Sequence, residues 1–250
     1  MAQLLEVCVD SLASARAAIT GGADRLEVCS ALETGGLTPY VSLVRKIRAE
    51  SSIPLRCLMR PRSGDFLLDE EDVAMLCEEI LQLRTAGADG FVLGGLCPDG
   101  RLDRAALRPL LDACGTYGKT LHRCIDVSLD PIASYRQAAD LGFDTVLTSG
   151  AAACCTDGLS ILRTLVQLRD ELHGPEILVC AGVNADVIAA LKRQLPELRA
   201  FHMSGKTLQP SRMAFRREGV PMGSPALDEW HRMVTSEMAV RCAKQALLEA

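Results

Sequence analysis

The sequence has little of what marks membrane, secreted or nucleic-acid-binding proteins. None of its apolar runs approaches the roughly 18 residues that a membrane-spanning helix needs. The first residues, MAQLLEVCVDS, lack the basic stretch and small-residue cleavage site of a signal peptide. Lys and Arg number 27 against 32 Asp and Glu, so the basic surplus of a nucleic-acid or membrane-surface binder is missing too. We therefore expect a cytoplasmic protein without nucleic-acid or membrane partners.

The cysteines lack the pattern of a disulfide scaffold. There are 11 of them, an odd number, and in 250 residues they stay far below the ~8–10% of a disulfide-rich chain. No two are spaced as Cys-x-x-Cys, the nearest approach being the adjacent Cys154 and Cys155. Reduced thiols in a cytosol are the simplest interpretation.

What the sequence does contain is a repeat, visible in the stretches GGADRLEV, AGADGFVL and LGFDTVL. In each, a glycine ends an alanine- and leucine-rich helical segment, as in a left-handed helix C-cap, and an aspartate opens a short apolar strand. The aspartates are 65 and 55 residues apart, the length of two strand–helix units. The glycines are Gly22, Gly87 and Gly142, and the aspartates are Asp24, Asp89 and Asp144.

Eight strand–helix alternations fill the chain and predict a parallel sheet closed as a single-domain (β/α)8 TIM barrel over residues 1–250. The alternative is an open doubly wound sheet, but no Gly-x-Gly-x-x-Gly follows the first strand and no linker divides the chain. One segment departs from the rhythm, since residues 205–225 form a long loop before the last helix. The expected strands cover 4–9, 24–29, 54–60, 89–94, 119–124, 144–149, 176–181 and 199–204. The expected helices cover 11–20, 38–50, 70–86, 103–116, 131–141, 158–172, 184–194 and 226–248.

Polar residues of the strands are expected to converge on one cavity. In such a barrel, strand residues alternate between the interior and the helices, and sites form at the carboxyl ends of the strands. The more apolar set of each strand is placed against the helices. For Glu6, an internal salt bridge with Arg25 explains the inward position as well as a ligand does. The inward residues predicted to be catalytic are Glu27, Arg60, His122 and His202.

Several motifs occur in one order along the chain: EVCVDS, GGADRLEVCSALETGGLTP, MRPRSGDF, GADGFVLGGLCPDGRLD, LHRCID, LTSG and FHMSGK. Together they resemble the copper homeostasis protein CutC family over essentially the whole chain. The RPR-x-GDF and HR-x-x-D segments are its most distinctive motifs. The resemblance implies a (β/α)8 barrel and a role in copper homeostasis through intracellular copper binding. The family commonly has Ala-Phe where this chain has Cys124-Ile125, which adds a thiol near the site.

Two cysteines offer a site for copper as Cu(I), which prefers thiolate or thioether ligands. Cys8 and Cys29 lie two residues beyond Glu6 and Glu27, with matching parity and at an expected matching height on adjacent strands. Because neighbouring strands are about 5 Å apart, the two thiols would share one ion. The resemblance reinforces this pair, and Cys124 is a weaker third candidate. The other interpretation is two small buried hydrophobic residues.

An alternative function is an enzyme that performs acid–base chemistry on a small anionic metabolite. Arg60 and Arg62 can fork onto a carboxylate or phosphate. His122 or His202 can be the acid–base group, and Glu27 can orient an imidazole or act as base. The turn at Ser63-Gly64 is expected to fold Asp65 back onto Arg62, which leaves Arg60 for the ligand. The expected ligand contacts are Arg60, Arg62, Asp126, Ser204 and Lys206.

A third possibility is a scaffold that works by oligomerising. Residues 205–225 and the apolar face of the last helix, which carries the only tryptophan, Trp230, would support a homodimer or a higher homo-oligomer. Such an assembly is compatible with either of the other functions. The expected partners are therefore a copper ion or a small anionic ligand, and further copies of the chain.

Overall fold

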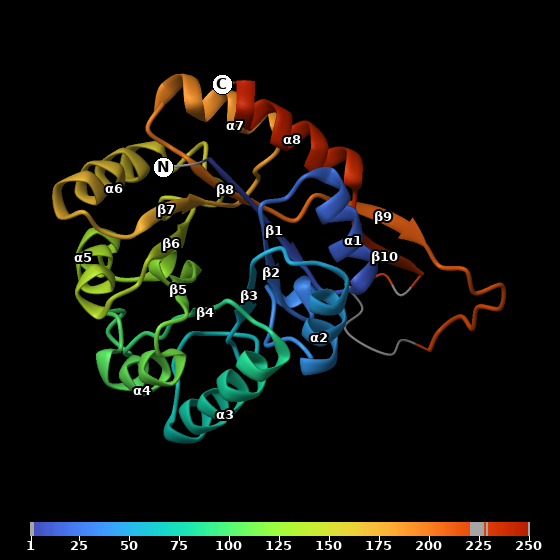
Figure 1. Ribbon diagram of the computed structural model, residues 1–250, viewed down its shortest axis with the longest axis horizontal. Helices are drawn as coiled ribbons and strands as arrows, with labels where there is room; N and C mark the ends of the chain where they lie inside the picture. Colours follow the sequence, from blue (N-terminus) through green and yellow to red (C-terminus); the bar gives the residue numbers. More distant parts are fainter. Residues whose placement is uncertain (1–2, 221–227, 229, 250) are drawn as a thin grey trace.

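Eight parallel strands close into a barrel in the computed structural model, which describes residues 3–220, 228 and 230–249 (Figure 1). The strands follow one another around the barrel in chain order, and β8 pairs with β1 to close it. The predicted (β/α)8 fold is confirmed, with strands that are mostly shorter than expected. They are β1 (Leu4–Val9), β2 (Arg25–Val28), β3 (Leu55–Leu58), β4 (Gly90–Leu93), β5 (Gly118–Leu121), β6 (Thr145–Thr148), β7 (Glu176–Val179) and β8 (Ala200–Met203).

Eight α-helices surround the barrel, and side chains cap the start of several of them. Asp69, Asp103 and Asp130 each accept a backbone N–H of the first turn, which satisfies donors that the helix itself leaves free. None of the described helices is long and apolar enough to cross a membrane. The helices are α1 (Leu12–Gly21), α2 (Val41–Glu50), α3 (Glu70–Ala86), α4 (Arg104–Cys114), α5 (Pro131–Leu141), α6 (Leu159–Leu172), α7 (Ala185–Gln194) and α8 (Glu237–Glu249), with 3₁₀ turns η1 (Leu32–Thr34) and η2 (Arg123–Val127).

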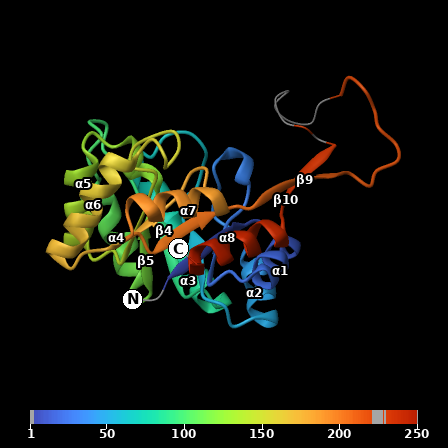
Figure 2. The ribbon, with the colours of Figure 1, turned by 90° about the horizontal axis from the view of Figure 1, so that it is seen from above.

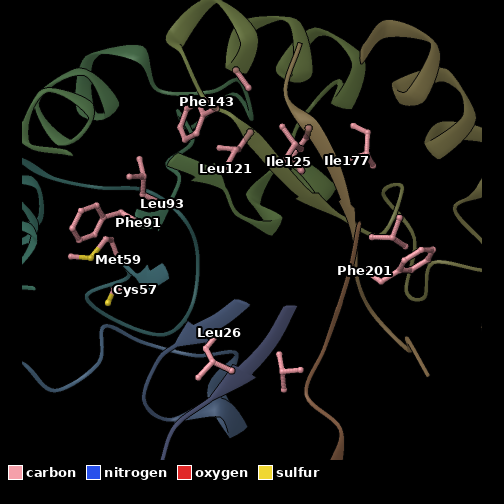
Figure 3. Close-up of a cluster of buried hydrophobic side chains, with 14 of the residues drawn as sticks. Leu26, Cys57, Met59, Phe91, Leu93, Leu121, Ile125, Phe143, Ile177 and Phe201 are labelled. Carbon is pink, nitrogen blue, oxygen red and sulfur yellow. The ribbon is translucent and has the colours of Figure 1, made fainter. Parts of the chain in front are cut away.

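The main hydrophobic core lies between the barrel strands and the helices around them (Figure 3). It joins strand residues such as Leu26 and Phe91 to helix residues such as Leu76 and Ile80, all of them buried. The alternation expected for β2 is correct, because Leu26 and Val28 belong to this outer core. The inward positions of β2 are therefore left for Arg25 and Glu27, whereas other strands place apolar residues such as Leu58 and Leu178 inside.

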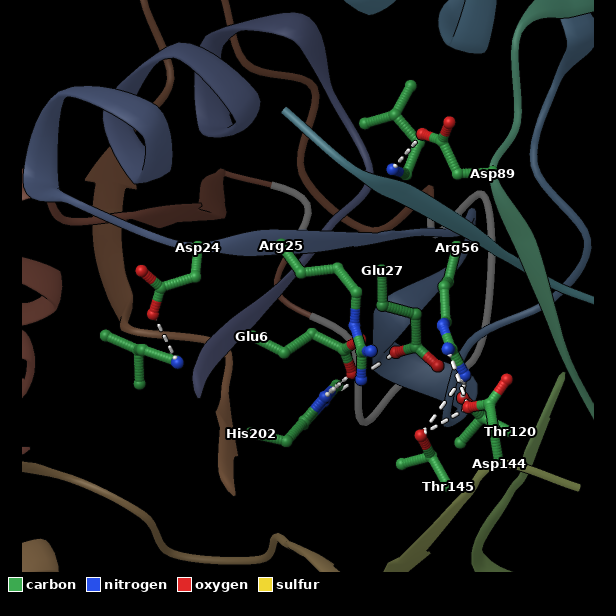
Figure 4. Close-up of polar contacts among 12 residues, drawn as sticks. Glu6, Asp24, Arg25, Glu27, Arg56, Asp89, Thr120, Asp144, Thr145 and His202 are labelled. Atoms are coloured by element: carbon green, nitrogen blue, oxygen red, sulfur yellow. Dashed lines mark hydrogen bonds and ion pairs between the residues drawn. The ribbon is translucent and has the colours of Figure 1, made fainter. Parts of the chain in front are cut away.

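The aspartates of the sequence repeat join neighbouring strands at the amino-terminal ends of the barrel strands (Figure 4). Each one opens an even-numbered strand, donates its backbone N–H to the preceding odd-numbered strand and accepts an N–H from the same residue of that strand. The side-chain bonds join Asp24 to Leu5, Asp89 to Leu55 and Asp144 to Lys119, at 2.7, 2.8 and 2.7 Å. These three carboxylates also pair with Lys244, Arg48 and Arg56, in the same order.

The segment after β8 differs from the prediction. Instead of one long loop and one long helix, it contains an antiparallel hairpin of β9 (Lys206–Pro210) and β10 (His231–Thr235), which leads away from the barrel in Figure 2. The last helix begins only at Glu237, so Trp230 lies just before β10 and its ring meets the Arg216 guanidinium at 5.0 Å. The helical interpretation failed because an apolar periodicity in so short a strand also fits a helix. Residues 221–227 and 229 lie outside the described residues.

Candidate functional site

A cavity of about 320 Å³ opens at the carboxyl ends of the barrel strands. Its volume lies at the lower end of the ~300–1,000 Å³ range of small-molecule sites. Most of the predicted site residues line it, which confirms that the strands bring them together. They are Cys8, Glu27, Arg60, His122, His202, Ser204 and Lys206. Arg62, Asp126, Cys29 and Cys124 do not line this cavity among the described residues.

Beneath the cavity, Glu6 is the centre of a buried network in which both of its carboxylate oxygens are paired (Figure 4). Its Oε2 accepts from Arg25 Nε at 2.5 Å, and its Oε1 lies 2.8 Å from Nδ1 of His202. Burial alone would raise the pKa of Glu6, but Arg25 and His202 outweigh it and lower this pKa to about 2. The predicted Glu6–Arg25 salt bridge is therefore present, and it also fixes one nitrogen of His202.

Glu27 faces the cavity without such a partner. It lies opposite Cys8 in the strand register, and its Oε2 is 3.6 Å from Nε2 of His202. Burial raises its pKa to about 7, with the nearby Glu6 carboxylate adding to the effect and His202 and Arg25 opposing it. A carboxyl group of this kind exchanges a proton near neutral pH, as a general acid or base requires.

Cys8, Glu27 and His202 form a compact group of metal-ligating side chains. One donor atom from each, a sulfur, a carboxylate oxygen and an imidazole nitrogen, lies within 4.8 Å of the others. Burial would lower the pKa of His202, but the facing Cys8 thiol and the Glu27 and Glu6 carboxylates raise it well above its usual value. The group combines donors that transition metals accept.

The expected equal height of Cys8 and Cys29 is wrong. The barrel stagger sets Cys8 opposite Glu27 and Val9 opposite Val28. Cys29 therefore lies nearer the carboxyl ends of the strands than Cys8 does. The Cys29 Sγ donates to the Val9 carbonyl at 3.4 Å, and the side chain is completely buried in a small apolar cluster that also contains Cys8. Burial, together with Cys8 and Glu27, raises the pKa of Cys29 well above its usual value.

Cys124 also differs from its expected place, because β5 ends at Leu121 and the chain turns into η2. The thiol is buried in the outer core, and burial raises its pKa far above the usual range. It is therefore not oriented into the cavity as a strand residue would be. His122, just before it, accepts a hydrogen bond from the Cys124 N–H at its Nδ1, and burial beside Arg60 lowers the pKa of His122 to about 3.

The two arginines of the RPR segment differ as expected. Arg62 Nη1 donates to Asp65 at 3.0 Å and its Nη2 to the Leu67 carbonyl at 2.7 Å, so the protein holds this side chain outside the cavity. Arg60 lines the cavity, and among the described residues its guanidinium donates only to carbonyl oxygens, those of Thr34, Gly36 and Gly64.

Asp126 was predicted to contact a ligand, but in the structure its carboxylate binds groups of the protein itself. Its carboxylate accepts from the Thr148 hydroxyl at 2.5 Å, from the Ser149 N–H at 3.1 Å and from Arg123 Nε at 2.8 Å. These bonds fix the loop after β6. Because the carboxylate oxygens are occupied by donors of the protein, Asp126 supports the wall of the cavity from outside.

Sequence reasoning missed Arg56, whose buried guanidinium pairs with Asp144 at 2.7 Å and donates to Thr120. Arg56 has the same parity as Arg60 on β3, so the alternation was the available signal. It also missed Arg123 and Cys180 as lining residues. Arg123 lies in η2, where strand alternation stops, whereas Cys180 keeps the inward parity of Leu178, so alternation was again the available signal.

Comparison with known proteins places the chain in a family. The sequence model of the CutC family matches residues 3–207. The chain belongs to the CutC family. It is 37% identical over 245 residues to a CutC family protein of Aliivibrio fischeri, covering 97% of this chain and 98% of the relative. It is 44% identical over 190 residues to the copper homeostasis protein cutC homolog of Caenorhabditis elegans, covering 75% and 74% of the two chains.

A solved CutC structure agrees with this assignment, and a second solved structure shares the fold. The CutC protein of Streptococcus agalactiae superposes with a TM-score of 0.75 at 25% identity, over 81% of this chain and 98% of that one. The N-(5'-phosphoribosyl)anthranilate isomerase of Pyrococcus furiosus, at 13% identity and a TM-score of 0.56, covers 99% of this chain and 100% of its own, and shows the fold alone. The resemblance seen in the motifs is thus confirmed over most of the CutC barrel.

Proposed function

We propose that this CutC family member serves copper homeostasis by binding a copper ion in the cavity, with Cys8, Glu27 and His202 as ligands. The observation that carries the proposal is the approach of their three donor atoms to within 4.8 Å of one another. Thiolate and imidazole ligands suit copper. Family membership supports the same role, since a relative 44% identical is named a copper homeostasis protein.

The surroundings of His202 favour metal binding at Nε2. Glu6 holds Nδ1 at 2.8 Å, and a carboxylate on the far nitrogen is the usual way to orient a metal-ligating imidazole. This leaves Nε2 on the side of Glu27, at 3.6 Å. The copper ion would be held by residues of three neighbouring strands, so the rigid barrel would position its ligands.

An anaerobic Cu(I) titration against a competing chelator tests the proposal. The wild type is expected to bind one ion per chain, and Cys8→Ser and Glu27→Gln to bind it about tenfold more weakly or worse. Cys77→Ser is the matched control, because Cys77 lies on α3 outside the cavity. Circular dichroism would confirm that each variant is folded.

The alternative ligand pair Cys8 and Cys29 is tested in the same titration. If Cys29→Ser abolishes binding while Glu27→Gln leaves it unchanged, the ion is held by the two thiols. Weak binding in the wild type, or binding that Cys8→Ser does not change, would contradict a copper site in this cavity.

A further inference from the structure

The wall of the cavity above the proposed copper ligands carries positive charge that the protein does not neutralise. Arg60, Arg123 and Lys206 line it. Arg123 pairs with Asp126 at 2.8 Å. Within residues 3–220, 228 and 230–249, no carboxylate lies within 4 Å of the charged nitrogens of Arg60 or Lys206. Cations placed in a cavity without counter-ions indicate a site for an anion.

Arg60 is fixed in place by groups that orient its guanidinium without neutralising it. Nη1 donates to Thr34 and Gly36 carbonyls at 3.2 Å each, and Nη2 to the Gly64 carbonyl at 2.9 Å. The guanidinium also lies over the Phe66 ring, 5.1 Å from its centroid. Its buried Nε has no hydrogen-bond partner among the described residues. Three carbonyls and one ring leave the full charge of Arg60 available to a ligand.

The loop after β7 adds backbone donors to the same cavity. Ala181 and Gly182 have φ of 69° and 82°, a left-handed conformation that is costly for the alanine. Both residues and Val183 line the cavity, and their N–H groups find no acceptor in the described part of the chain. Successive backbone N–H groups in such turns form concave anion sites. In (β/α)8 barrels, phosphate groups are frequently held by the loops after strands 7 and 8.

We infer that the cavity binds a small organic oxyanion, a carboxylate or a phosphate ester, through Arg60, Lys206 and the backbone N–H groups of residues 181–183. The ligand is small because the cavity encloses about 320 Å³. The inference goes beyond copper binding, since none of these groups is a copper ligand. The cavity would then hold an anion as a second ligand, above Glu27 and His202.

Thermal unfolding of the metal-free protein, kept in a chelator, tests the inference. The probes are inorganic phosphate, glycerol 3-phosphate and malonate at millimolar concentrations, each compared with sodium chloride of equal ionic strength. A ligand that binds only the folded state raises Tm as its concentration passes Kd. We expect a saturable rise in the wild type that is lost in Arg60→Gln and reduced in Lys206→Met. Arg16→Gln is the matched control, because Arg16 pairs with Glu50 on the outer helices. This variant is expected to keep the rise in Tm.

A second measurement guards against variants that fail to fold. In the wild type, the amide resonance of Gly182 is expected to move on addition of the anion that raises Tm. A rise with glycerol 3-phosphate alone assigns a phosphate ester, and a rise with malonate alone assigns a carboxylate. The inference is overturned if none of the probes gives a saturable rise, if sodium chloride gives an equal one, or if Arg60→Gln keeps it. Since no copper is present, these outcomes are independent of the copper titration.

Discussion

The tripeptide Glu-Val-Cys occurs twice, within β1 and across the end of β2, and the barrel gives the two glutamates opposite environments. Glu6 lies in register with Arg25 on one side and His202 on the other, and its pKa is held at about 2. Glu27 lies in register with Cys8, and burial raises its pKa to about 7. The difference comes from the stagger of the strands, which shifts β2 along β1.

The comparison separates structural charge from chemically available charge. Around Glu6, each carboxylate oxygen meets a specific nitrogen, so the group is locked in its ionised form. Glu27 has only the longer approach to His202 at 3.6 Å, so its proton is free to exchange. The same distinction holds for Arg62 and Arg60, because Asp65 neutralises only Arg62. In each of these two comparisons, the residue without a close counter-ion, Glu27 or Arg60, is the one that lines the cavity.

Removing the side-chain charge of Glu6 is expected to have the largest effect. Glu6→Gln leaves Arg25 buried without its carboxylate partner, and breaking a buried ion pair in this way costs about 3–5 kcal/mol of unfolding free energy. Glu27→Gln, above a pH of about 7, is expected to be no less stable than the wild type. Urea denaturation of the three metal-free proteins measures both. Equal losses in the two variants would show that the environments of the two glutamates do not differ.

The pH dependence of stability is expected to run in opposite directions for the two glutamates. The folded pKa of Glu6, about 2, is below its usual 4.5, so its stabilisation is present above pH 4.5 and is lost as pH falls towards 2. The folded pKa of Glu27, about 7, is above 4.5, so its contribution is full below pH 4.5 and is lost as pH rises towards 7. Each change amounts to about 3 kcal/mol.

Unfolding curves of the wild type and both variants across this range check the signs. The stability difference between wild type and Glu6→Gln is expected to grow from pH 2 to 4.5. The unfolding free energy of the wild type minus that of Glu27→Gln is expected to fall from pH 4.5 to about 7. Two slopes of the same sign would contradict the assignment of one glutamate as permanently ionised.

The smallest expected effect is a difference in protonation between two histidines of the same cavity. His122 stays neutral until the pH falls to about 3, because it is buried beside Arg60. His202 stays protonated well above its usual range, because Cys8, Glu27 and Glu6 face it and outweigh the effect of burial. Nitrogen-15 spectra of the metal-free protein would show both states at neutral pH, with His122→Asn identifying the resonance. A charged His122 at neutral pH would contradict the structure.

Much of the barrel is predictable from local signals in the sequence. A glycine that ends a helix and an aspartate that opens a strand recur at a spacing of two units, and each is explained by backbone geometry within a few residues. Alternation within strands also predicts that Glu27, Arg60, His122 and His202 reach one cavity, because parity depends only on position along a strand.

The remaining features depend on relations between distant segments. Cys8 meets Glu27 and not Cys29 because of stagger, which a strand's own sequence does not encode. Asp126 of η2 binds the end of β6 and the loop after it because these residues approach it in space, from 22 residues further along the chain onwards. The hairpin of β9 and β10 requires two segments on either side of residues 211–230 to pair. None of these relations leaves a periodic signal.

The aspartate bonds at the amino-terminal ends of the strands distinguish three strand pairs of the barrel from the fourth. Three pairs are fastened by a carboxylate, whereas the residue that precedes β8 is Arg199. There the Arg169 guanidinium of α6 joins the Glu176 carboxylate of β7 to the Glu197 carbonyl before β8. This fourth pair carries the loops with Ala181, Gly182, Ser204 and Lys206 that border the cavity. Arg169→Met should therefore speed the exchange of amide hydrogens in β7 and β8 more than in the other strands. The strand pair that borders the cavity is thus held, at its opposite end, by a side chain of the outer helices.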